Sequence, residues 1–206
     1  DAITTGDYNV GVGDNALTNV TTASDCTAVG AYALTLNTTG NNNVALGYNC
    51  ASLITTGYQN VTLGVSAQPS TATANYQFTL GSTSISNLRC NDTSISSLSD
   101  ERDKTNIVDI PLGLDFINTL RPVSFDWDRR DGSMEGKKDF GFIAQELKLA
   151  ADATPYAESM RLVNEENLEK LEADPMKTYP ILVKAIQELT AKNDALEARL
   201  IALENA

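Results

Sequence analysis

The chain has 206 residues, or about one and a half domains at roughly 150 residues each, and its formal net charge is −12. This excess of acidic residues argues against a nucleic-acid partner, because few basic side chains are available to contact phosphates. The sequence contains no histidine and no apolar run of the roughly 18–20 residues that span a bilayer, so histidine triads, histidine zinc sites and membrane insertion are not expected, nor is any metal or cofactor.

The two halves of the chain differ in composition. Residues 1–98 contain five acidic residues and one basic residue, Arg89, whereas residues 99–206 contain the other 22 acidic and 14 basic residues. A serine-rich stretch lies where the composition changes, which is typical of a domain junction. We therefore expect a repeat region over 1–88, a linker over 89–98 and a second domain after it.

The first half repeats with a period of 17 residues. Glycines recur at this spacing, and each follows a valine or leucine: Val12-Gly13, Val29-Gly30, Leu46-Gly47, Leu63-Gly64 and Leu80-Gly81. A fixed short period indicates a stack in which each repeat is one structural unit. Large apolar and small residues alternate, and Lys, Glu and Arg are scarce, which favours β-structure. The glycines are expected at the corners of the coils, with positive φ.

The large apolar residues of each repeat are expected to point into the coil. These residues are Val10, Val12, Val44, Leu46, Val61, Leu63, Phe78 and Leu80. A coil of this length encloses a thin core, so several chains are expected to associate and bury more surface.

Three units of the repeat region carry a specific resemblance: TTGDYNVGVGDNAL at 4–17, NTTGNNNVALGYNCA at 37–51 and ITTGYQNVTLGVSA at 54–67. They resemble the head repeats of trimeric, YadA-like autotransporter adhesins, which also occur in phage tail fibres. The resemblance covers about residues 2–85 and implies a trimeric, left-handed parallel β-roll. Tyr32, Tyr48 and Tyr58 are candidates for contact with a host-surface glycan or protein, and a purely structural stalk is the alternative.

Three motifs of the second half occur in order: SDERDKTNI at 99–107, DFGFIAQEL at 139–147 and YPILVKAIQEL at 179–189. Together they resemble the C-terminal intramolecular chaperone domain of phage tail spikes and fibres of the endosialidase type. In that family the motif Ser-Asp-x-Arg-x-Lys-x-Asn-Ile marks a self-cleavage site. The motif residues here are Ser99, Asp100, Arg102, Lys104, Asn106 and Ile107. The resemblance implies cleavage between Leu98 and Ser99, with Ser99 as nucleophile and Lys104 as general base.

The chemistry of such a pair is intelligible from the residues alone. A serine hydroxyl needs a base, and a lysine serves only as the free amine, which requires its pKa to fall from about 10.4 to about 7–8 through burial or a nearby cation. Ser99 and Lys104 are five residues apart, so a turn or bulge must bring them together. Attack on the carbonyl before Ser99 would be an N→O acyl shift followed by ester hydrolysis, and attack on a neighbouring chain is equally open.

The remaining elements of the second half follow from apolar spacing. We expect a helix over 112–120, a strand over 123–127, a strand near 140–143, a short helix through Leu147, and an irregular region over 152–178 with a helix near Leu168 and Leu171. Trp127 and the phenylalanines are expected in the core.

The C-terminus carries a heptad pattern, which predicts a coiled coil over about 179–205. Position a is occupied by Ile186, Asn193 and Leu200, and position d by Leu182, Leu189, Leu196 and Leu203. In a parallel arrangement Lys192 would meet Glu197, and Arg199 would meet Glu204, of the next chain. The heptads fit a dimer as well as a trimer, or a single helix packed on its own domain; the two resemblances favour the trimer.

Taken together, these features predict a mixed fold: a trimeric β-roll, then a small α+β chaperone domain that ends in a coiled coil. The expected function is that of a phage tail-fibre or tail-spike segment, located in the virion and assembled in the host cytoplasm. Its expected partners are two further copies of itself and other tail proteins. The alternative is a non-cleaving trimerisation cap of a host-binding fibre or adhesin.

Overall fold

The computed structural model describes residues 5–91 and 95–205. The chain forms two compact units, which are described separately: the repeats up to Arg89 with Trp127–Lys137, and Cys90–Asp126 with Lys138 onward. Of the linker expected over 89–98, residues 92–94 lie outside the described residues.

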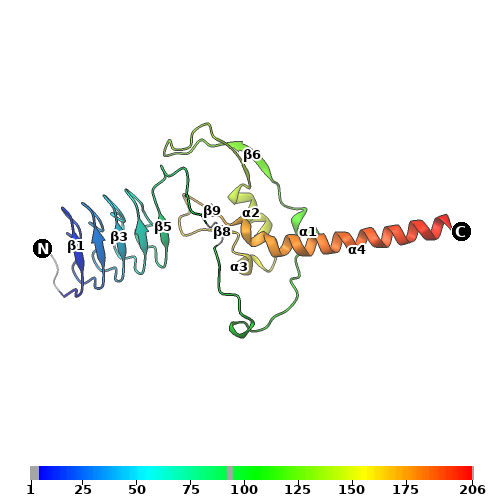
Figure 1. Ribbon diagram of the computed structural model, residues 1–206, viewed down its shortest axis with the longest axis horizontal. Helices are drawn as coiled ribbons and strands as arrows, with labels where there is room; N and C mark the ends of the chain where they lie inside the picture. Colours follow the sequence, from blue (N-terminus) through cyan, green and yellow to red (C-terminus); the bar gives the residue numbers. More distant parts are fainter. Residues whose placement is uncertain (1–4, 92–94, 206) are drawn as a thin grey trace. The chain divides into compact units, whose positions relative to one another are not determined.

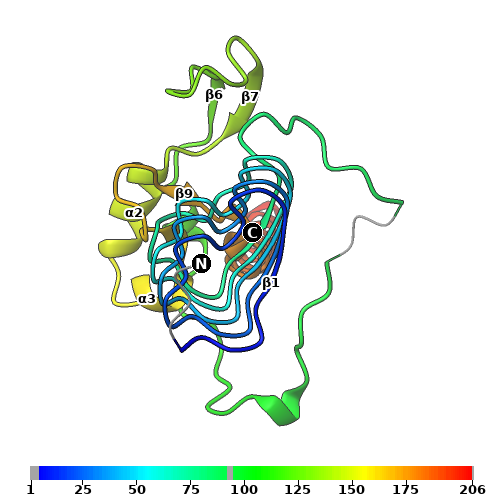
Figure 2. The same cartoon turned by 90° about the vertical axis from the view of Figure 1, so that its left-hand side faces the viewer.

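The repeat region is a parallel β-solenoid, as the period predicts (Figure 1). Its strands are β1 (Val10–Val12), β2 (Thr27–Val29), β3 (Val44–Leu46), β4 (Val61–Leu63) and β5 (Phe78–Leu80). Each strand pairs in parallel with the next, and Val10 lies opposite Thr27, which is the same position one repeat later. Viewed along the stack, successive coils superimpose (Figure 2). The left-handed sense and the trimeric association remain predictions.

The regular 17-residue spacing of the glycines has the expected cause. Gly30 and Gly47 have φ of +130° and +139°, a region that side chains other than glycine rarely adopt. A Cβ on Gly47 would also lie 2.6 Å from the carbonyl oxygen of Gly64 in the next coil. Both the conformation and the close approach of neighbouring coils therefore require glycine.

The prediction of which residues point into the solenoid was wrong. Ala28, Ala45 and Thr62, at the middle of their strands, are fully buried, whereas the flanking large residues point outward. The clearest cases are Val10, Val12, Leu46, Phe78 and Leu80, which are exposed. The sequence correctly predicted that large and small residues alternate between the two faces of each strand, but it assigned the large residues to the wrong face. The narrow interior of a short coil accepts only small side chains from this sheet.

Two rows of outward-facing side chains result, which we call the outer rows. One contains Val10, Thr27, Val44, Val61 and Phe78, and the other contains Val12, Val29, Leu46, Leu63 and Leu80. Strand pairing aligns each row along the length of the solenoid. The rows contain no charged side chain and form a continuous, mostly apolar surface, a kind of patch that marks interaction sites.

A buried polar ladder inside the solenoid was not predicted. Asn43 and Asn60 are buried at equivalent positions, and the Asn60 side-chain amide donates to the side-chain oxygen of Asn43 at 3.0 Å. The same amide also donates to the carbonyl of Ala74 at 2.7 Å. The ladder satisfies the corner carbonyls that the stacked coils turn inward.

The second unit is small and mixed in structure. Its helices are α1 (Leu114–Ile117), α2 (Ala144–Asp152), α3 (Ala157–Met160) and α4 (Tyr179–Glu204), with 3₁₀ turns η1 (Glu101–Asp103) and η2 (Pro175–Thr178). Its strands are β6 (Val123–Asp126) and β7 (Lys138–Gly141), which pair in antiparallel fashion, and β8 (Val163–Asn164) and β9 (Glu172–Ala173), which form a second pair. The core contains Phe116, Leu147, Ala151, Met160, Leu162 and Ile181.

Several expectations for this unit need correction. The helix over 112–120 is only the single turn of α1, although Leu112 and Leu120 still pack against the core. No helix forms near Leu168 and Leu171, because this segment is the connection between β8 and β9. Phe140 is exposed on the β6–β7 hairpin rather than buried in the core.

Replacing Gly47 should destabilise the solenoid, whereas replacing Gly11 should not. Gly47→Ala forces a side chain into positive φ, which costs about 1–2 kcal/mol, and into the next coil. Gly11→Ala is the matched control, since its Cβ would meet ordinary contacts at 3.5 Å and Ala28 already occupies the equivalent position. Thermal unfolding followed by far-ultraviolet circular dichroism measures the difference. Equal melting temperatures for the two variants would contradict the coil-contact explanation.

Candidate functional site

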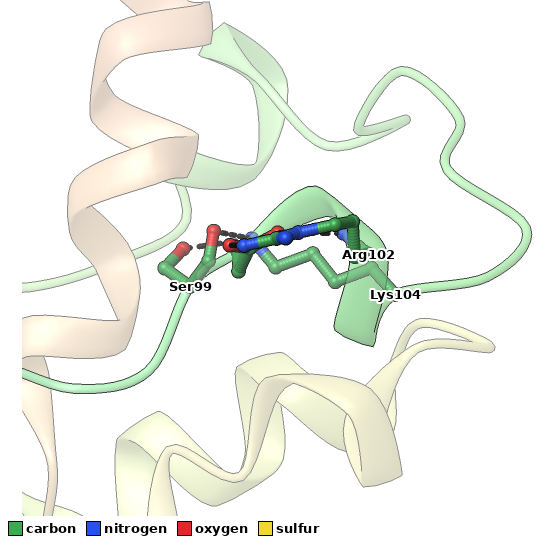
Figure 3. Close-up of polar contacts among 4 residues, drawn as sticks. Ser99, Arg102 and Lys104 are labelled. Atoms are coloured by element: carbon green, nitrogen blue, oxygen red, sulfur yellow. Dashed lines mark hydrogen bonds and ion pairs between the residues drawn. The ribbon is translucent and has the colours of Figure 1, made fainter.

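A tight turn brings Ser99 and Lys104 together. The turn η1 lies between them, with Asp100 as its N-cap: a carboxylate oxygen of Asp100 accepts from the backbone N–H of Arg102 at 2.9 Å. At the other end, the N–H of Lys104 donates to the carbonyl of Glu101 at 3.0 Å. The chain therefore reverses within five residues, and the Lys104 side chain points back to Ser99 (Figure 3).

Lys104 contacts Ser99 at two atoms. Its ammonium nitrogen Nζ donates to Ser99 Oγ at 2.7 Å and to the Ser99 carbonyl oxygen at 3.1 Å. The 2.7 Å between Nζ and Oγ is a distance at which a proton can pass between a hydroxyl and an amine. The geometry fits a nucleophile and its general base, provided that the lysine first loses its proton. The catalytic roles themselves remain predictions.

An ion pair borders the nucleophile. Arg102 Nη2 lies 2.6 Å from Oδ2 of Asp100, and Nε donates to Oδ1 at 3.0 Å (Figure 3). Hydrogen bonds from Arg102 hold the pKa of Asp100 below its usual value, and Asp100 raises the pKa of Arg102. Asp100 thus stays ionised, and both of its oxygens are occupied.

The last polar residue of the motif acts on the backbone. Asn106 has φ of +54°, the left-handed conformation that asparagine adopts more readily than most residues. The structure therefore gives Asn106 a role in turning the chain after Lys104.

The site is open to water in a single chain. Ser99 and Lys104 are exposed, as are the apolar side chains of Ile95, Leu98 and Val108, which precede and follow them in the sequence. These apolar side chains are uncovered in the single chain.

Helix α4 uses two different faces. Ile181 and Ala185 are buried in their own unit, and the Glu188 carboxylate accepts from the N–H of Leu114 at the start of α1 at 2.8 Å. The heptad residues form a separate stripe, here called the heptad stripe, that is exposed: Leu182, Ile186, Leu189, Asn193, Leu196, Leu200 and Leu203. The amide of Asn193 donates to Glu197 within the same helix at 3.1 Å. The domain thus packs on one face of α4 and leaves the other uncovered.

The candidate binding tyrosines form two surface pairs. The rings of Tyr32 and Tyr48 meet edge-on with centroids 6.1 Å apart. Tyr58 pairs in the same manner with Tyr76 at 5.2 Å, a partner that the sequence analysis did not select. Contact of these rings with a host molecule remains a prediction.

Searches for other kinds of site gave negative results within the described residues. No helix there is long and apolar enough to cross a bilayer. Across residues 5–91 and 95–205, no cluster of three or more cysteine or acidic side chains is arranged to hold a metal ion.

Comparison with protein families gives a match over residues 99–155 to the family described as chaperone of endosialidase. The match covers less than half of the chain and begins at Ser99, the residue that η1 brings to Lys104. Searches of curated proteins and of solved structures found no match. Residues 99–155 therefore carry the sequence of an intramolecular chaperone domain similar to that of endosialidase.

Proposed function

We propose that the chain is part of a phage tail fibre or spike in which the chaperone domain joins three copies and aligns their solenoids. The observation that carries the proposal is the heptad stripe of α4, which stays exposed although the domain has closed its own core on another face of the same helix. An apolar stripe with period 3.5 is the seam of a coiled coil. The chaperone match supports the same role.

The outer rows of the solenoid support self-association independently. They are free of charge, so identical copies can bring these surfaces together despite the net charge of −12 on each chain. Their 17-residue spacing is the same in every copy, which allows parallel solenoids to match coil for coil. The heptads alone do not choose between two and three copies, and the resemblance of both halves to trimeric proteins favours three.

The order of folding explains why such a protein needs a chaperone. Contacts between strands of different chains form slowly, because the entropy of association must be lost before the contacts stabilise the product. Helices with local contacts form quickly. Once the α4 helices pair, the three solenoids are at a high effective concentration and in register. Other tail proteins and a host-surface molecule are the further partners of such a fibre.

Two adjacent residues of α4 test the coiled coil. Leu200 and Ile201 are equally exposed in the single chain, at 56% and 57%, but only Leu200 is at a seam position. Leu200→Glu removes from each copy a leucine that the coiled coil would bury, which costs the assembly about 1.5–3 kcal/mol per copy. The variant should therefore dissociate upon dilution. Ile201→Glu is the matched control and should leave it intact. Size-exclusion chromatography with light scattering reads out the mass, and equal behaviour of the two variants would contradict the seam.

Self-cleavage is the second function that we propose, and the 2.7 Å contact between Lys104 Nζ and Ser99 Oγ favours it. Ser99 Oγ attacks the carbonyl carbon of Leu98 while its proton passes to the neutral Lys104 amine. The C–N bond then breaks, and the nitrogen of Ser99 takes that proton, which leaves an ester between Leu98 and Ser99 Oγ. Water adds hydroxide to the Leu98 carbonyl and a proton to Oγ. The products are a Leu98 carboxylic acid, which loses its proton to water, and a free Ser99 amine.

Assembly is the event that we propose to activate the site. In the single chain water surrounds the pair, whereas a cover formed by further copies would favour the neutral amine. Cleavage would then follow only completed assembly and make unfolding kinetically difficult. Attack within one chain and attack on a neighbouring chain both fit this scheme.

Mass spectrometry of the denatured chain tests cleavage. We expect fragments that end at Leu98 and begin at Ser99, and their complete loss in Ser99→Ala and Lys104→Ala, because these variants lack the nucleophile or the base. Ser97→Ala is the matched control, since this exposed serine lies just before the bond and should leave cleavage unchanged. A single intact species in the assembled wild type would instead favour a non-cleaving trimerisation cap.

A further inference from the structure

We propose that Arg102 is a positioning residue for self-cleavage: it occupies both carboxylate oxygens of Asp100 and thereby keeps this neighbour of the nucleophile from pairing with Lys104. The inference rests on the proposed cleavage and adds a residue to its machinery. Arg102 touches neither the scissile bond nor the attacking atom, so its action passes through Asp100.

The problem that Arg102 solves arises from the sequence itself. An acidic residue, Asp100, directly follows the nucleophile, and the Lys104 ammonium lies on Ser99, one residue away. A free carboxylate at this position would attract the ammonium and stabilise the protonated form of the lysine. That form cannot accept a proton from Ser99. The attraction would also become stronger once assembly excludes water from the site.

In the structure the Asp100 carboxylate is bonded to Arg102. Oδ2 of Asp100 lies 2.6 Å from Arg102 Nη2, and Oδ1 accepts from Arg102 Nε at 3.0 Å and from the Arg102 backbone N–H at 2.9 Å. The planar guanidinium matches the two oxygens in a way that a lysine cannot. Asp100 is thereby used twice, as the cap of η1 and as the partner of Arg102, and the guanidinium holds both of its oxygens toward Arg102.

Other charges near the pair do not provide an alternative explanation. The remaining charged side chains of the turn are Glu101 and Asp103, and in the described part of the chain neither is bonded to the Lys104 ammonium, which donates to Ser99. Asp100 differs from them because its carboxylate is held against the turn that carries Ser99. An ion pair at such an exposed position contributes little to folding, so a large effect on cleavage would not come from stability.

The test compares cleavage rates across pH in the full-length chain. We expect Arg102→Gln to slow cleavage at neutral pH by about tenfold or more, which corresponds to at least one unit of displacement of the pH–rate profile to higher pH. Asp100→Asn with Arg102→Gln should restore most of the rate at neutral pH, because asparagine still caps the turn and carries no charge. Arg121→Gln is the matched control, since it removes a comparable exposed ion pair, with Glu146, that does not involve the turn η1.

The outcomes separate this inference from the proposed cleavage. If the double variant is as slow as Arg102→Gln and the profile does not move, Arg102 has only a structural role and the inference is wrong. If the wild type gives no fragments, cleavage fails, and the inference is then decided in a Ser99→Ala background by acylation of the Lys104 amine. There Arg102→Gln should lower the fraction of Lys104 acylated at a given pH. Unchanged labelling would overturn the inference.

Discussion

Apolar side chains that one chain cannot cover are the feature on which the rest of this structure depends. The coils of the solenoid are too narrow to accept large residues from their sheet, so Ala28 and Ala45 fill the interior while the outer rows face outward. In the second unit, α4 closes the core through Ile181 and Ala185 and leaves the heptad stripe exposed. In the proposed assembly further copies bury both surfaces, which would explain why a chaperone domain follows a solenoid.

The candidate site, like the apolar surfaces, is left exposed in a single chain. The turn η1 brings Lys104 to Ser99 within a single chain, but it leaves both residues exposed. The turn alone thus sets the geometry of the Ser99–Lys104 pair, whereas we propose that its reactivity depends on what covers it. Under the proposed function, such a site stays unreactive during folding and becomes reactive upon assembly. The pair of Asp100 and Arg102 belongs to the local part, because it both caps the turn and confines a charge.

The sequence predicted those features that repeat or follow strict spacing. The 17-residue period predicted parallel coils and corner glycines, and the heptads predicted a helix whose observed bounds are Tyr179–Glu204. The face of each strand was wrong, since alternation does not reveal how wide the interior is. The expected helix near Leu168 was wrong because two leucines at helical spacing do not outweigh the β8–β9 pairing. The sequence predicted the need for a turn between Ser99 and Lys104, whereas the hydrogen bonds of Asp100 became visible only in three dimensions.

The central claim is that three copies cover the outer rows and the heptad stripe. Sedimentation equilibrium of the intact Ser99→Ala chain at micromolar concentration tests this claim most directly, because it measures mass without assuming a shape. The account predicts a single species with three times the mass of the chain. Folded single chains at that concentration would contradict it.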